Sequence, residues 1–559
     1  MNSFVEHLTF LYGDQAGRET FSHLATLIEN YRAQIPSPRA RALTERDAVL
    51  ITYGDQVRAP DKSPLHTFAD FGAAHLRELV STIHILPFYP YSSDDGFSVI
   101  DYRAVNPGFG TWDDVTRVGK NFRLMFDLVA NHVSAQSEWF QKFLRDDPKY
   151  RDYFVVVPEG ADVSRVIRPR TLPLLTKFET PSGAKNVWTT FSADQVDLNV
   201  ANPAVLLDLV DTLLFYVARG AELIRLDAIA FLWKEYGTTC LHLPQTHRII
   251  QLMRAVLDDL APHVVLITET NVPHADNLAY FGDGAHEAQM VYNFALPPLT
   301  LHTFHTGDAT ALARWASTLT LPSSRVTFFN FLASHDGIGL NPARGILRDA
   351  EIDALVARVQ AHGGLVSHKN NPDGTTSPYE LNVNLFDALN DPRADESLAI
   401  QVERFIAAQA IMLALVGVPG IYFHSLFGSR GWQAGVAQTG HNRTINREKL
   451  ERATLESDLA DPGSRRAQVF ARYAQLVRAR ASHPAFTPYG TMRVLDAGSA
   501  IFALVRDDQV WCLHNVTNAT QKFDLQLVPG SRVTDLITGE SFDATLALEL
   551  KPYQVLWLV

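Results

Sequence analysis

Eight short, strongly apolar runs, separated by helical or irregular stretches, constrain the fold of this 559-residue chain more than any other feature. The runs are AVLITYG (48–54), STIHILPF (81–88), FRLMFDLV (122–129), AELIRLD (221–227), HVVLITE (263–269), MVYNFAL (290–296), VTFFNFL (326–332) and VGVPGIYF (416–423). Apolar strands that alternate with helices predict a parallel sheet covered by helices, and eight of them favour closure into a (β/α)8 barrel. An open doubly wound sheet is the alternative, but ITYGDQ lacks the G-x-G-x-x-G pattern of that fold.

The remaining sequence predicts modules inserted into the barrel or attached to it. Helical periodicity before the prolines Pro36 and Pro38 predicts a helical extension, and short alternating runs near the C-terminus (among them AIFALVR and FDLQLV) predict a small antiparallel β-domain. The expected division is an N-terminal helical extension (1–46), the barrel (47–132 and 196–487), an inserted lobe after the third strand (133–195), an extended loop insertion after the seventh strand (337–395) and the β-domain (488–559).

Charge and composition exclude several classes of protein. The formal net charge is −12 and the pI is about 5.9, whereas nucleic acid and anionic membrane surfaces are bound by basic faces. The N-terminal MNSFVEHLTFLYGDQ has no basic and apolar signal pattern, and no window reaches the roughly 18 apolar residues of a membrane span. Two cysteines, Cys240 and Cys512, are too few for a disulfide framework or a zinc site. We expect a cytoplasmic protein that binds neither nucleic acid nor membrane.

Three of the runs end in ionisable residues that suit glycoside chemistry. RLDA (225–228), ITETN (267–271) and ASHDG (333–337) place Asp227, Glu269 and Asp336 at strand ends, which form the active-site face of a barrel. Retaining glycoside chemistry needs one carboxylate as nucleophile and one carboxylic acid as proton donor, and Asp227 and Glu269 on adjacent strands fit these roles. A single Asp at a strand end is also compatible with a helix cap or an ion pair, but the ordered combination favours catalysis.

Two further residues of these segments suit the same pocket. Arg225 lies two residues before Asp227, on the same side of the strand, where a charge-assisted hydrogen bond would keep that carboxylate ionised. His335 and Asp336 are expected to bind sugar hydroxyls and to stabilise an oxocarbenium-like transition state.

With DLVANH (127–132), these segments resemble the four signature regions of the α-amylase superfamily, glycoside hydrolase family 13, from about residue 48 to the C-terminus. Within that family the chain is similar to the sucrose phosphorylase subgroup. The resemblance implies Asp227 as the nucleophile, Glu269 as the acid/base and Asp336 as the carboxylate that stabilises the transition state. Arg225, His335 and His132 are then glucose-site residues.

Other matched segments imply further contacts to a single glucosyl unit. HILPFYPYSSDDGFSVIDY (84–102) implies that Asp94 and Phe97 close the far side of the glucose site. HNRTINRE (441–448) implies that Arg443 is a partner of Asp94 and of the glucose hydroxyls, and FSADQVDLN (191–199) places Gln195 near the same sugar. An Arg and an Asp also form surface pairs that contribute little, so each of these assignments is an expectation.

The second substrate distinguishes a phosphorylase from a hydrolase, because both form the same glucosyl-enzyme. In an acidic protein, phosphate must be bound by a local group of cations and hydroxyl donors. IRPRTLPLL (167–175) resembles the phosphate-binding RPR segment of the subgroup, which implies a phosphate contact for Arg170, and SPYELN supplies Tyr379. Asn131 corresponds to a calcium ligand of many amylases, a requirement this subgroup generally lacks, so neither metal nor organic cofactor is expected.

The leaving group is predicted from the loop insertion. Ser377 stands where sucrose phosphorylases carry an aspartate for fructose, whereas Arg344 and Lys369 add positive charge that suits an anionic acceptor. The segments SHDGIGLNPARG, HKNNPDGTTSPYE and YFHSLFGSRG are most similar to the branch that phosphorolyses glucosylglycerate. We therefore predict phosphorolysis of 2-O-α-glucosylglycerate by a monomer or homodimer. Sucrose, sucrose 6′-phosphate or glucosylglycerol as substrate, a hydrolase or transglucosidase, and an inactive amylase-like binding protein are the alternatives.

Overall fold

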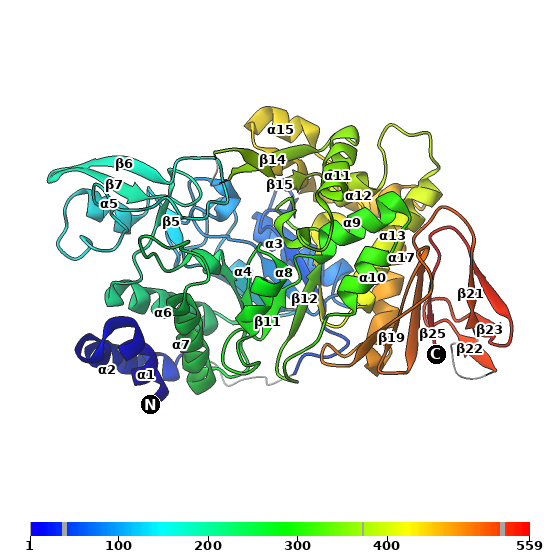
Figure 1. Ribbon diagram of the computed structural model, residues 1–559, viewed down its shortest axis with the longest axis horizontal. Coiled ribbons are helices and arrows are strands. Elements are labelled where there is room, and N and C mark those ends of the chain that lie inside the picture. Colours follow the sequence, from blue (N-terminus) through cyan, green and yellow to red (C-terminus); the bar gives the residue numbers. More distant parts are fainter. Residues whose placement is uncertain (1, 36–41, 372–373, 526–530) are drawn as a thin grey trace.

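The computed structural model describes residues 2–35, 42–371, 374–525 and 531–559. A closed barrel of eight parallel strands forms its centre, which confirms the predicted barrel (Figure 1). The barrel strands are β1 (Val49–Thr52), β3 (Thr82–Ile85), β4 (Arg123–Val129), β9 (Ala221–Asp227), β10 (Val265–Thr268), β11 (Met290–Tyr292), β12 (Thr327–Phe331) and β16 (Val418–Tyr422). Each strand lies within one of the eight predicted runs.

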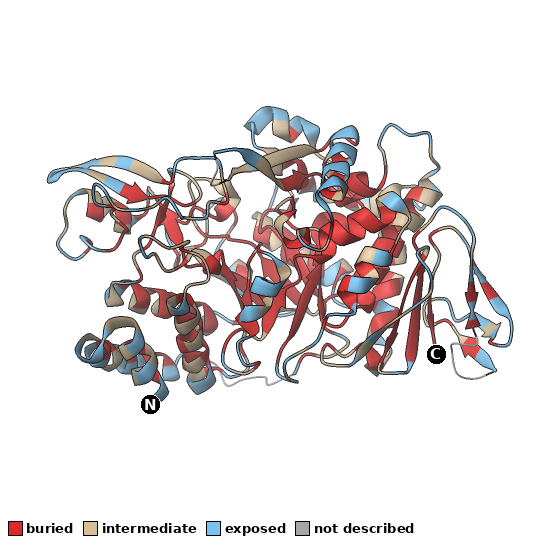
Figure 2. Ribbon diagram, in the orientation of Figure 1, coloured by how far each residue is buried: buried red, intermediate tan, exposed pale blue. Residues whose placement is uncertain are grey.

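Helices cover the outside of the barrel. They are α3 (Pro64–His75), α4 (Trp112–Gly119), α6 (Pro203–Ala218), α7 (Pro244–Leu260), α8 (His274–Leu278), α9 (Leu296–Thr306), α10 (Thr310–Ala316), α13 (Leu398–Ala414) and α17 (Arg465–Ala481). Nearly all strand residues are buried, because side chains fill the barrel on one face and helices pack on the other (Figure 2). This double burial explains why the strands appear in the sequence as continuous apolar runs.

Two N-terminal helices pack against the barrel helices. α1 (Asn2–Tyr12) contacts α7, and α2 (Asp14–Arg32) contacts α6 and α7. The Tyr31 hydroxyl donates to Asp211 of α6 at 2.8 Å, and Arg32 pairs with Asp259 of α7 at 2.8 Å. Pro36 and Pro38, the expected end of this extension, lie outside the described residues.

Residues 133–195 leave the barrel after β4 and return before α6. β5 (His132–Ser134) pairs antiparallel with β8 (Gln195–Asp197), so the two ends of the segment lie together. Between them are α5 (Glu138–Leu144) and the hairpin of β6 (Leu175–Thr180) and β7 (Gly183–Trp188), which extends to one end of the molecule in Figure 1. The segment therefore forms secondary structure of its own outside the barrel.

After β12 the chain forms a small sheet of β13 (Ile338–Gly339), β15 (Thr376–Asn382) and β14 (Leu365–Asn370), accompanied by α11 (Asp349–Ala361) and α12 (Leu385–Leu389). We call β14 and β15 with their connection the acceptor hairpin. Gly337 allows β15 to pass close to the barrel mouth, because a Cβ atom there would lie 2.5 Å from Glu380 Cγ and 2.6 Å from the Leu381 carbonyl oxygen. Any larger residue at this position would displace the hairpin.

The C-terminal strands form a separate layer at the other end of the molecule (Figure 1). β18 (Met492–Leu495), β19 (Ile501–Arg506), β20 (Val510–Asn515) and β25 (Val555–Leu558) form an antiparallel sheet, and β21 (Gln521–Asp524) pairs with β24 (Ala547–Leu550). β22 (Arg532–Thr534) and β23 (Ser541–Asp543) were not predicted, because they are short and largely polar. Residues 526–528 of the predicted FDLQLV strand lie outside the described residues.

Within the described ranges, no helix combines the length and the apolar composition that crossing a membrane requires. The exact boundaries of the modules stay a prediction from the sequence.

Candidate active site

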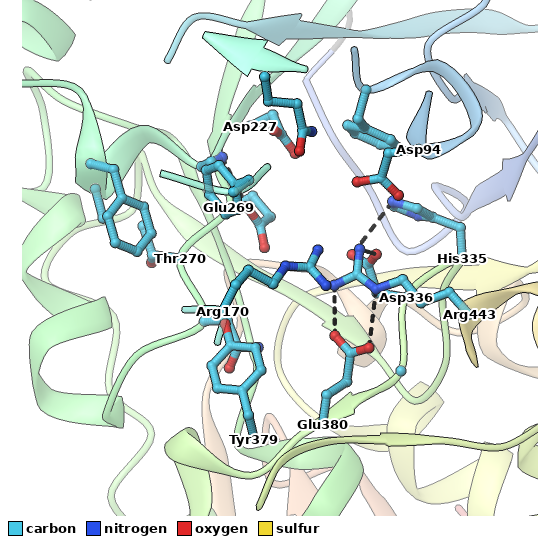
Figure 3. Close-up of a pocket in the computed structure, with 18 of the residues that line it drawn as sticks. Asp94, Arg170, Asp227, Glu269, Thr270, His335, Asp336, Tyr379, Glu380 and Arg443 are labelled. Carbon is cyan, nitrogen blue, oxygen red and sulfur yellow. Dashed lines mark hydrogen bonds and ion pairs between the residues drawn. The ribbon is translucent and has the colours of Figure 1, made fainter. Parts of the chain in front are cut away.

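The register of the parallel strands brings two carboxylates together at the mouth of the barrel. Asp227 is the last residue of β9, and Glu269 directly follows β10, which pairs with β9. The Glu269 backbone N–H donates to the Leu226 carbonyl at 3.2 Å, so the two carboxylates come from neighbouring backbone positions. Both line a pocket that also contains Asp336, and Figure 3 shows the three acids around one cavity.

A single buried guanidinium contacts both carboxylates. Arg225 Nη1 donates to Asp227 Oδ1 at 2.8 Å, and its Nη2 lies 3.8 Å from Glu269 Oε2. Ala228 adopts a positive φ of 49°, and its N–H donates to Glu269 Oε2 at 3.0 Å. A strained backbone of this kind persists where the surroundings enforce it, often at active sites.

The protonation of Asp227 and Glu269 is coupled. Burial raises the pKa of each carboxyl, and Arg225 opposes the rise in both. Two neighbouring buried carboxylates cannot both ionise easily, so the pair is expected to hold one proton. The guanidinium donates directly to Asp227 and lies farther from Glu269, which favours the charge on Asp227 and the proton on Glu269.

Asp336 is the third acid, and its environment differs from that of the pair. Burial opposes its ionisation, but the guanidinium groups of Arg443 and Arg447 help to outweigh burial, and the pKa of Asp336 lies well below its usual range. Burial lowers the pKa of His335 to about 3, so this imidazole is neutral near pH 7. The His335 ring stacks on Phe97 with ring centroids 4.8 Å apart. Asp336 is therefore a fixed negative charge beside the stacked rings of His335 and Phe97.

Arg443 is held between two acids (Figure 3). Its Nη1 lies 2.5 Å from Asp336 Oδ1, and its Nε and Nη2 donate to Glu380 at 3.0 and 2.6 Å. Glu380 belongs to β15 and is 1% exposed. Since Glu380 also lines the pocket, this pair connects the acceptor hairpin to the carboxylate of Asp336.

The partner of Asp94 differs from the expected one. Its ion pair is with Arg447 Nη1 at 3.5 Å, and the same nitrogen lies 2.6 Å from Asp95. Arg443 acts on Asp94 through its charge: burial would raise the pKa of Asp94, but Arg443 and Arg447 together lower it. The HNRTINRE segment thus supplies two arginines to the site rather than one.

His132 and Gln195 lie together in the lining of the same pocket. His132 Nε2 is 3.1 Å from the Phe97 carbonyl oxygen and 3.2 Å from Gln195 Nε2. Burial lowers the pKa of His132, so a neutral ring is favoured. β5 carries His132 and β8 carries Gln195. Because the two strands pair, these residues come into contact although 63 positions separate them in the sequence.

Arg170 and Tyr379 line the same pocket from other segments. Among the residues that the structure describes, Arg170 has no hydrogen bond or ion pair, although its charge acts on Asp94 and Tyr379. Burial raises the pKa of Tyr379, so its hydroxyl stays protonated and able to donate. Figure 3 shows Arg170 extending between Glu269 and Tyr379.

Arg344 and Lys369 do not line this pocket. Lys369 lies on β14, where its Nζ donates to Asn341 Oδ1 at 3.0 Å, and Arg344 lies 3.7 Å from the exposed Asp349. Burial and the charge of Arg344 lower the pKa of Lys369, so the two cations influence each other. They form a second basic region, on the acceptor hairpin and the segment before α11.

Lys234 supplies a cation near Asn131, the position that resembles a calcium ligand of amylases. Its Nζ lies 2.6 Å from Asn131 Oδ1 and 2.7 Å from Asp197 Oδ2. Asn131 Nδ2 donates to the same Asp197 oxygen at 3.1 Å. An ammonium group therefore joins these two side chains directly.

Among the residues near the reacting centre that reasoning from the sequence missed are Glu380, Arg447, Phe191 and Asn271. Each lies in or beside a segment that had been singled out: Glu380 follows Tyr379, Arg447 lies in HNRTINRE, Phe191 begins FSADQVDLN and Asn271 ends ITETN. The local signal was therefore present, but it did not indicate which side chains point into the pocket.

Known proteins resemble this chain over its full length. The model of the α-amylase catalytic domain matches residues 75–337. The chain is 53% identical over 561 residues to the glucosylglycerate phosphorylase of Allomeiothermus silvanus, covering 100% of this chain and 98% of that protein. It is 31% identical to the sucrose phosphorylase of Agrobacterium vitis, covering 81% of this chain and 91% of the relative.

The fold resembles that of a solved relative as well. The crystal structure of sucrose 6F-phosphate phosphorylase from Thermoanaerobacter thermosaccharolyticum superposes with a TM-score of 0.74 at 24% identity, covering 92% of this chain and 100% of the other. The chain belongs to the α-amylase superfamily, glycoside hydrolase family 13. Within that family it is a glycoside phosphorylase of the sucrose phosphorylase subgroup.

Proposed function

We propose that this enzyme phosphorolyses 2-O-α-glucosylglycerate, with retention of configuration, to α-glucose 1-phosphate and glycerate. The observation that carries the proposal is the guanidinium of Arg170, which enters the pocket beside Tyr379 without a partner among the described residues. A free cation next to a hydroxyl donor is suited to an anionic nucleophile. The full-length similarity to a glucosylglycerate phosphorylase supports the same assignment.

In the first step an Asp227 oxygen attacks the anomeric carbon of the glucosyl unit. The bond from that carbon to the glycerate oxygen breaks, and Glu269 transfers its proton to the departing oxygen. The raised pKa of Glu269 keeps this proton available near neutral pH. The product of the step is a β-glucosyl ester of Asp227 and free glycerate.

In the second step a phosphate oxygen attacks the same carbon and the ester bond to Asp227 breaks. The phosphate O–H returns a proton to Glu269, so the enzyme regains its starting state. We assign the positioning of phosphate to Arg170 and Tyr379. Their task is to hold phosphate, rather than water, in line with the ester.

In this proposal the glucosyl unit lies in the pocket beside Asp227. Asp336 stabilises the positive charge that develops on the sugar, and Arg225 keeps Asp227 oriented. Phe97 contributes an apolar surface. The proposed hydrogen-bonding contacts to glucose hydroxyls come from Asp94, His132, Gln195, His335 and Arg443.

The glycerate carboxylate is assigned to Arg344 and Lys369. Both lie outside the described pocket lining, so they reach an acceptor that extends from the glucosyl unit toward the acceptor hairpin. A neutral acceptor would give these cations no charge to pair with beyond the exposed Asp349 that Arg344 already contacts. The cytoplasmic location and the monomeric or homodimeric state stay predictions.

The test is a set of parallel assays for α-glucose 1-phosphate release from glucosylglycerate, sucrose, sucrose 6′-phosphate and glucosylglycerol. We expect the highest kcat/KM with glucosylglycerate and a strict requirement for phosphate. Faster turnover of a neutral glucoside would contradict the anionic acceptor. Glucose release at the same rate without phosphate would indicate a hydrolase.

A further inference from the structure

His84 is a buried histidine inside the barrel that the proposed mechanism does not use. It lies on β3, is fully buried, and its Nε2 is 2.6 Å from Asp127 Oδ2. Its Nδ1 is buried without a hydrogen-bond partner in the described part of the chain. Burying a polar ring with half its hydrogen-bonding capacity unused is costly, so the contact to Asp127 merits a functional explanation.

Asp127 connects His84 to the reacting centre. One carboxylate oxygen contacts His84, and the other accepts a hydrogen bond from Arg225 Nη1. Burial would raise the pKa of Asp127, but His84 and Arg225 outweigh it and hold the pKa at about 2. Asp127 is therefore a permanent negative charge in the barrel interior.

The same nitrogen of Arg225 serves both Asp127 and Asp227. Arg225 Nη1 donates to Asp227 Oδ1 at 2.8 Å as well as to Asp127. The four side chains come from three consecutive barrel strands, β3, β4 and β9, whose register places Asp127 opposite Arg225. They form a continuous chain of contacts from His84 to the nucleophile.

We propose that His84 is a positioning residue for the nucleophile, acting through Asp127 and Arg225. When Asp227 becomes an ester it loses its negative charge, so Arg225 loses the buried carboxylate to which it donates at 2.8 Å, while the charge that Glu269 gains lies farther away, 3.8 Å from Nη2. Asp127 remains ionised and keeps Arg225 paired and in place, provided that His84 holds the Asp127 carboxylate in its orientation. A buried cation left without a partner would raise the free energy of the intermediate. The inference rests on the proposed function in one respect, the role of Asp227 as nucleophile.

A pair of substitutions separates the hydrogen bond from the size of the side chain. In His84→Gln the amide nitrogen is three bonds from Cβ, as Nε2 is in histidine, so a donor to Asp127 is retained. In His84→Asn the nitrogen is one bond closer and does not reach. We expect His84→Asn to lower kcat about 10- to 100-fold, the value of one hydrogen bond to a buried charge, and His84→Gln to recover most of it. KM for the glucoside and for phosphate should change little in both variants.

A second donor tests which residue the effect passes through. α-Glucosyl fluoride has a leaving group that needs little protonation, so it reports on Asp227 rather than on Glu269. A defect that persists with the fluoride supports the proposal, whereas recovery with the fluoride would place the effect on the acid and overturn it. Because the fluoride contains no glycerate, this arm also remains informative if the assignment of glucosylglycerate is wrong.

His514→Asn is the matched control, because His514 is a fully buried histidine of β20 in the C-terminal sheet. It should leave kcat unchanged. A folded His84→Asn enzyme with normal kcat, or one with an altered KM alone, would refute the positioning role.

A measurement on the unmodified protein covers the case in which His84→Asn does not fold. In the 15N-histidine-labelled enzyme, the His84 signal is identified by its absence from His84→Gln. Trapping the ester with a fluorinated glucosyl fluoride should shift this signal, since the charge on Asp227 is lost three contacts away, beyond Asp127 and Arg225. An unchanged signal would overturn the inference. Mass spectrometry of the trapped peptide identifies the esterified residue independently, so an error about Asp227 is distinguished from an error about His84.

Discussion

The two walls of the pocket differ in how their charges are paired. On the wall that we propose to bind glucose, called the glucose wall here, Arg443 joins Asp336 to Glu380, and Arg447 contacts Asp94, with distances from 2.5 to 3.5 Å. On the proposed acceptor side, Arg170 has no partner among the described residues. Lys369, outside the pocket lining, donates to the amide oxygen of Asn341 and pairs with no acid in the described part of the chain. In the free protein the charges of the glucose wall pair with one another, whereas Arg170 and Lys369 pair with no described acid.

This difference matches the chemistry of the two kinds of ligand. A glucosyl unit is neutral, so the charges that bind it must already neutralise one another, because a buried unpaired charge is costly. Phosphate and glycerate are anions that bring the missing charge with them. Cations left unpaired in the free enzyme therefore favour an anionic ligand over water.

The largest effect is expected at the proposed nucleophile, because both half-reactions pass through it. Asp227→Asn should lower kcat by at least about 10⁴-fold, because the amide cannot form the ester that both half-reactions require. Release of α-glucose 1-phosphate measures this directly. Asp353→Asn, an exposed change on α11, is the control and should have no effect. Substantial residual turnover by Asp227→Asn would remove Asp227 from its assigned role.

On the glucose wall, loss of Arg443 should affect both stability and catalysis. Arg443→Ala leaves the buried Glu380 and Asp336 without their shared cation, so we expect the free energy of unfolding to fall by about 3–5 kcal/mol. Since the same cation holds Asp336 ionised, kcat/KM should fall by about 10²- to 10³-fold. Urea unfolding and steady-state kinetics are the measurements.

Removing one acid sharpens this test. Arg443→Ala combined with Glu380→Gln should recover part of the lost stability, because one unpaired buried charge is removed. If the double variant is no more stable than Arg443→Ala, the pairing between Arg443 and Glu380 does not explain the loss.

On the proposed acceptor side, loss of Arg170 should weaken phosphate binding without lowering stability. Arg170→Gln removes a cation without a protein partner among the described residues, so the free energy of unfolding should stay unchanged. KM for phosphate should rise about 10- to 100-fold, the value of a lost charge-assisted hydrogen bond, and hydrolysis should increase relative to phosphorolysis. Arg168→Gln is the matched control, since Arg168 lies in the same segment but does not line the pocket. Equal effects of the two substitutions would indicate a general rather than a specific role of positive charge.

The smallest effect is expected at the acceptor hairpin. Lys369→Gln should raise KM for glucosylglycerate about 3- to 10-fold, because Lys369 is only half-buried and water and salt screen its charge. The same variant should lose little with glucosylglycerol, which lacks the carboxylate. Lys177→Gln on β6 serves as the control. A matching loss with both glucosides would argue against recognition of the glycerate carboxylate by Lys369.

Much of the site was predictable because it depends on local patterns. The order of the eight strands and the positions of Asp227, Glu269 and Asp336 at or just beyond strand ends were readable from the sequence, since parallel strands in a barrel place these ends on one face. The same-side relation of Arg225 and Asp227 follows from the two-residue period of a strand, and the structure has the expected hydrogen bond.

The pairing of charges was not predictable in the same way. Arg443 was expected beside Asp94, yet its ion pairs are with Asp336 and Glu380, and Arg447 contacts Asp94 instead. Which of two arginines four residues apart meets a given acid depends on the path of the short 3₁₀ helix at Asn442–Asn446 and on the close approach that Gly337 allows. Neither feature has a clear signature in the sequence.

The sequence by itself determined the barrel and the chemical groups at its mouth, because backbone periodicity and parallel pairing act over a few residues. Only the tertiary structure decided which of these groups neutralise one another. Arg443 and Glu380 are 63 positions apart, and Arg447 and Asp95 are 352 apart. Contacts over such separations are set by how whole segments pack. That packing also leaves Arg170 without an acidic partner among the described residues, which is why we propose that it binds an anion.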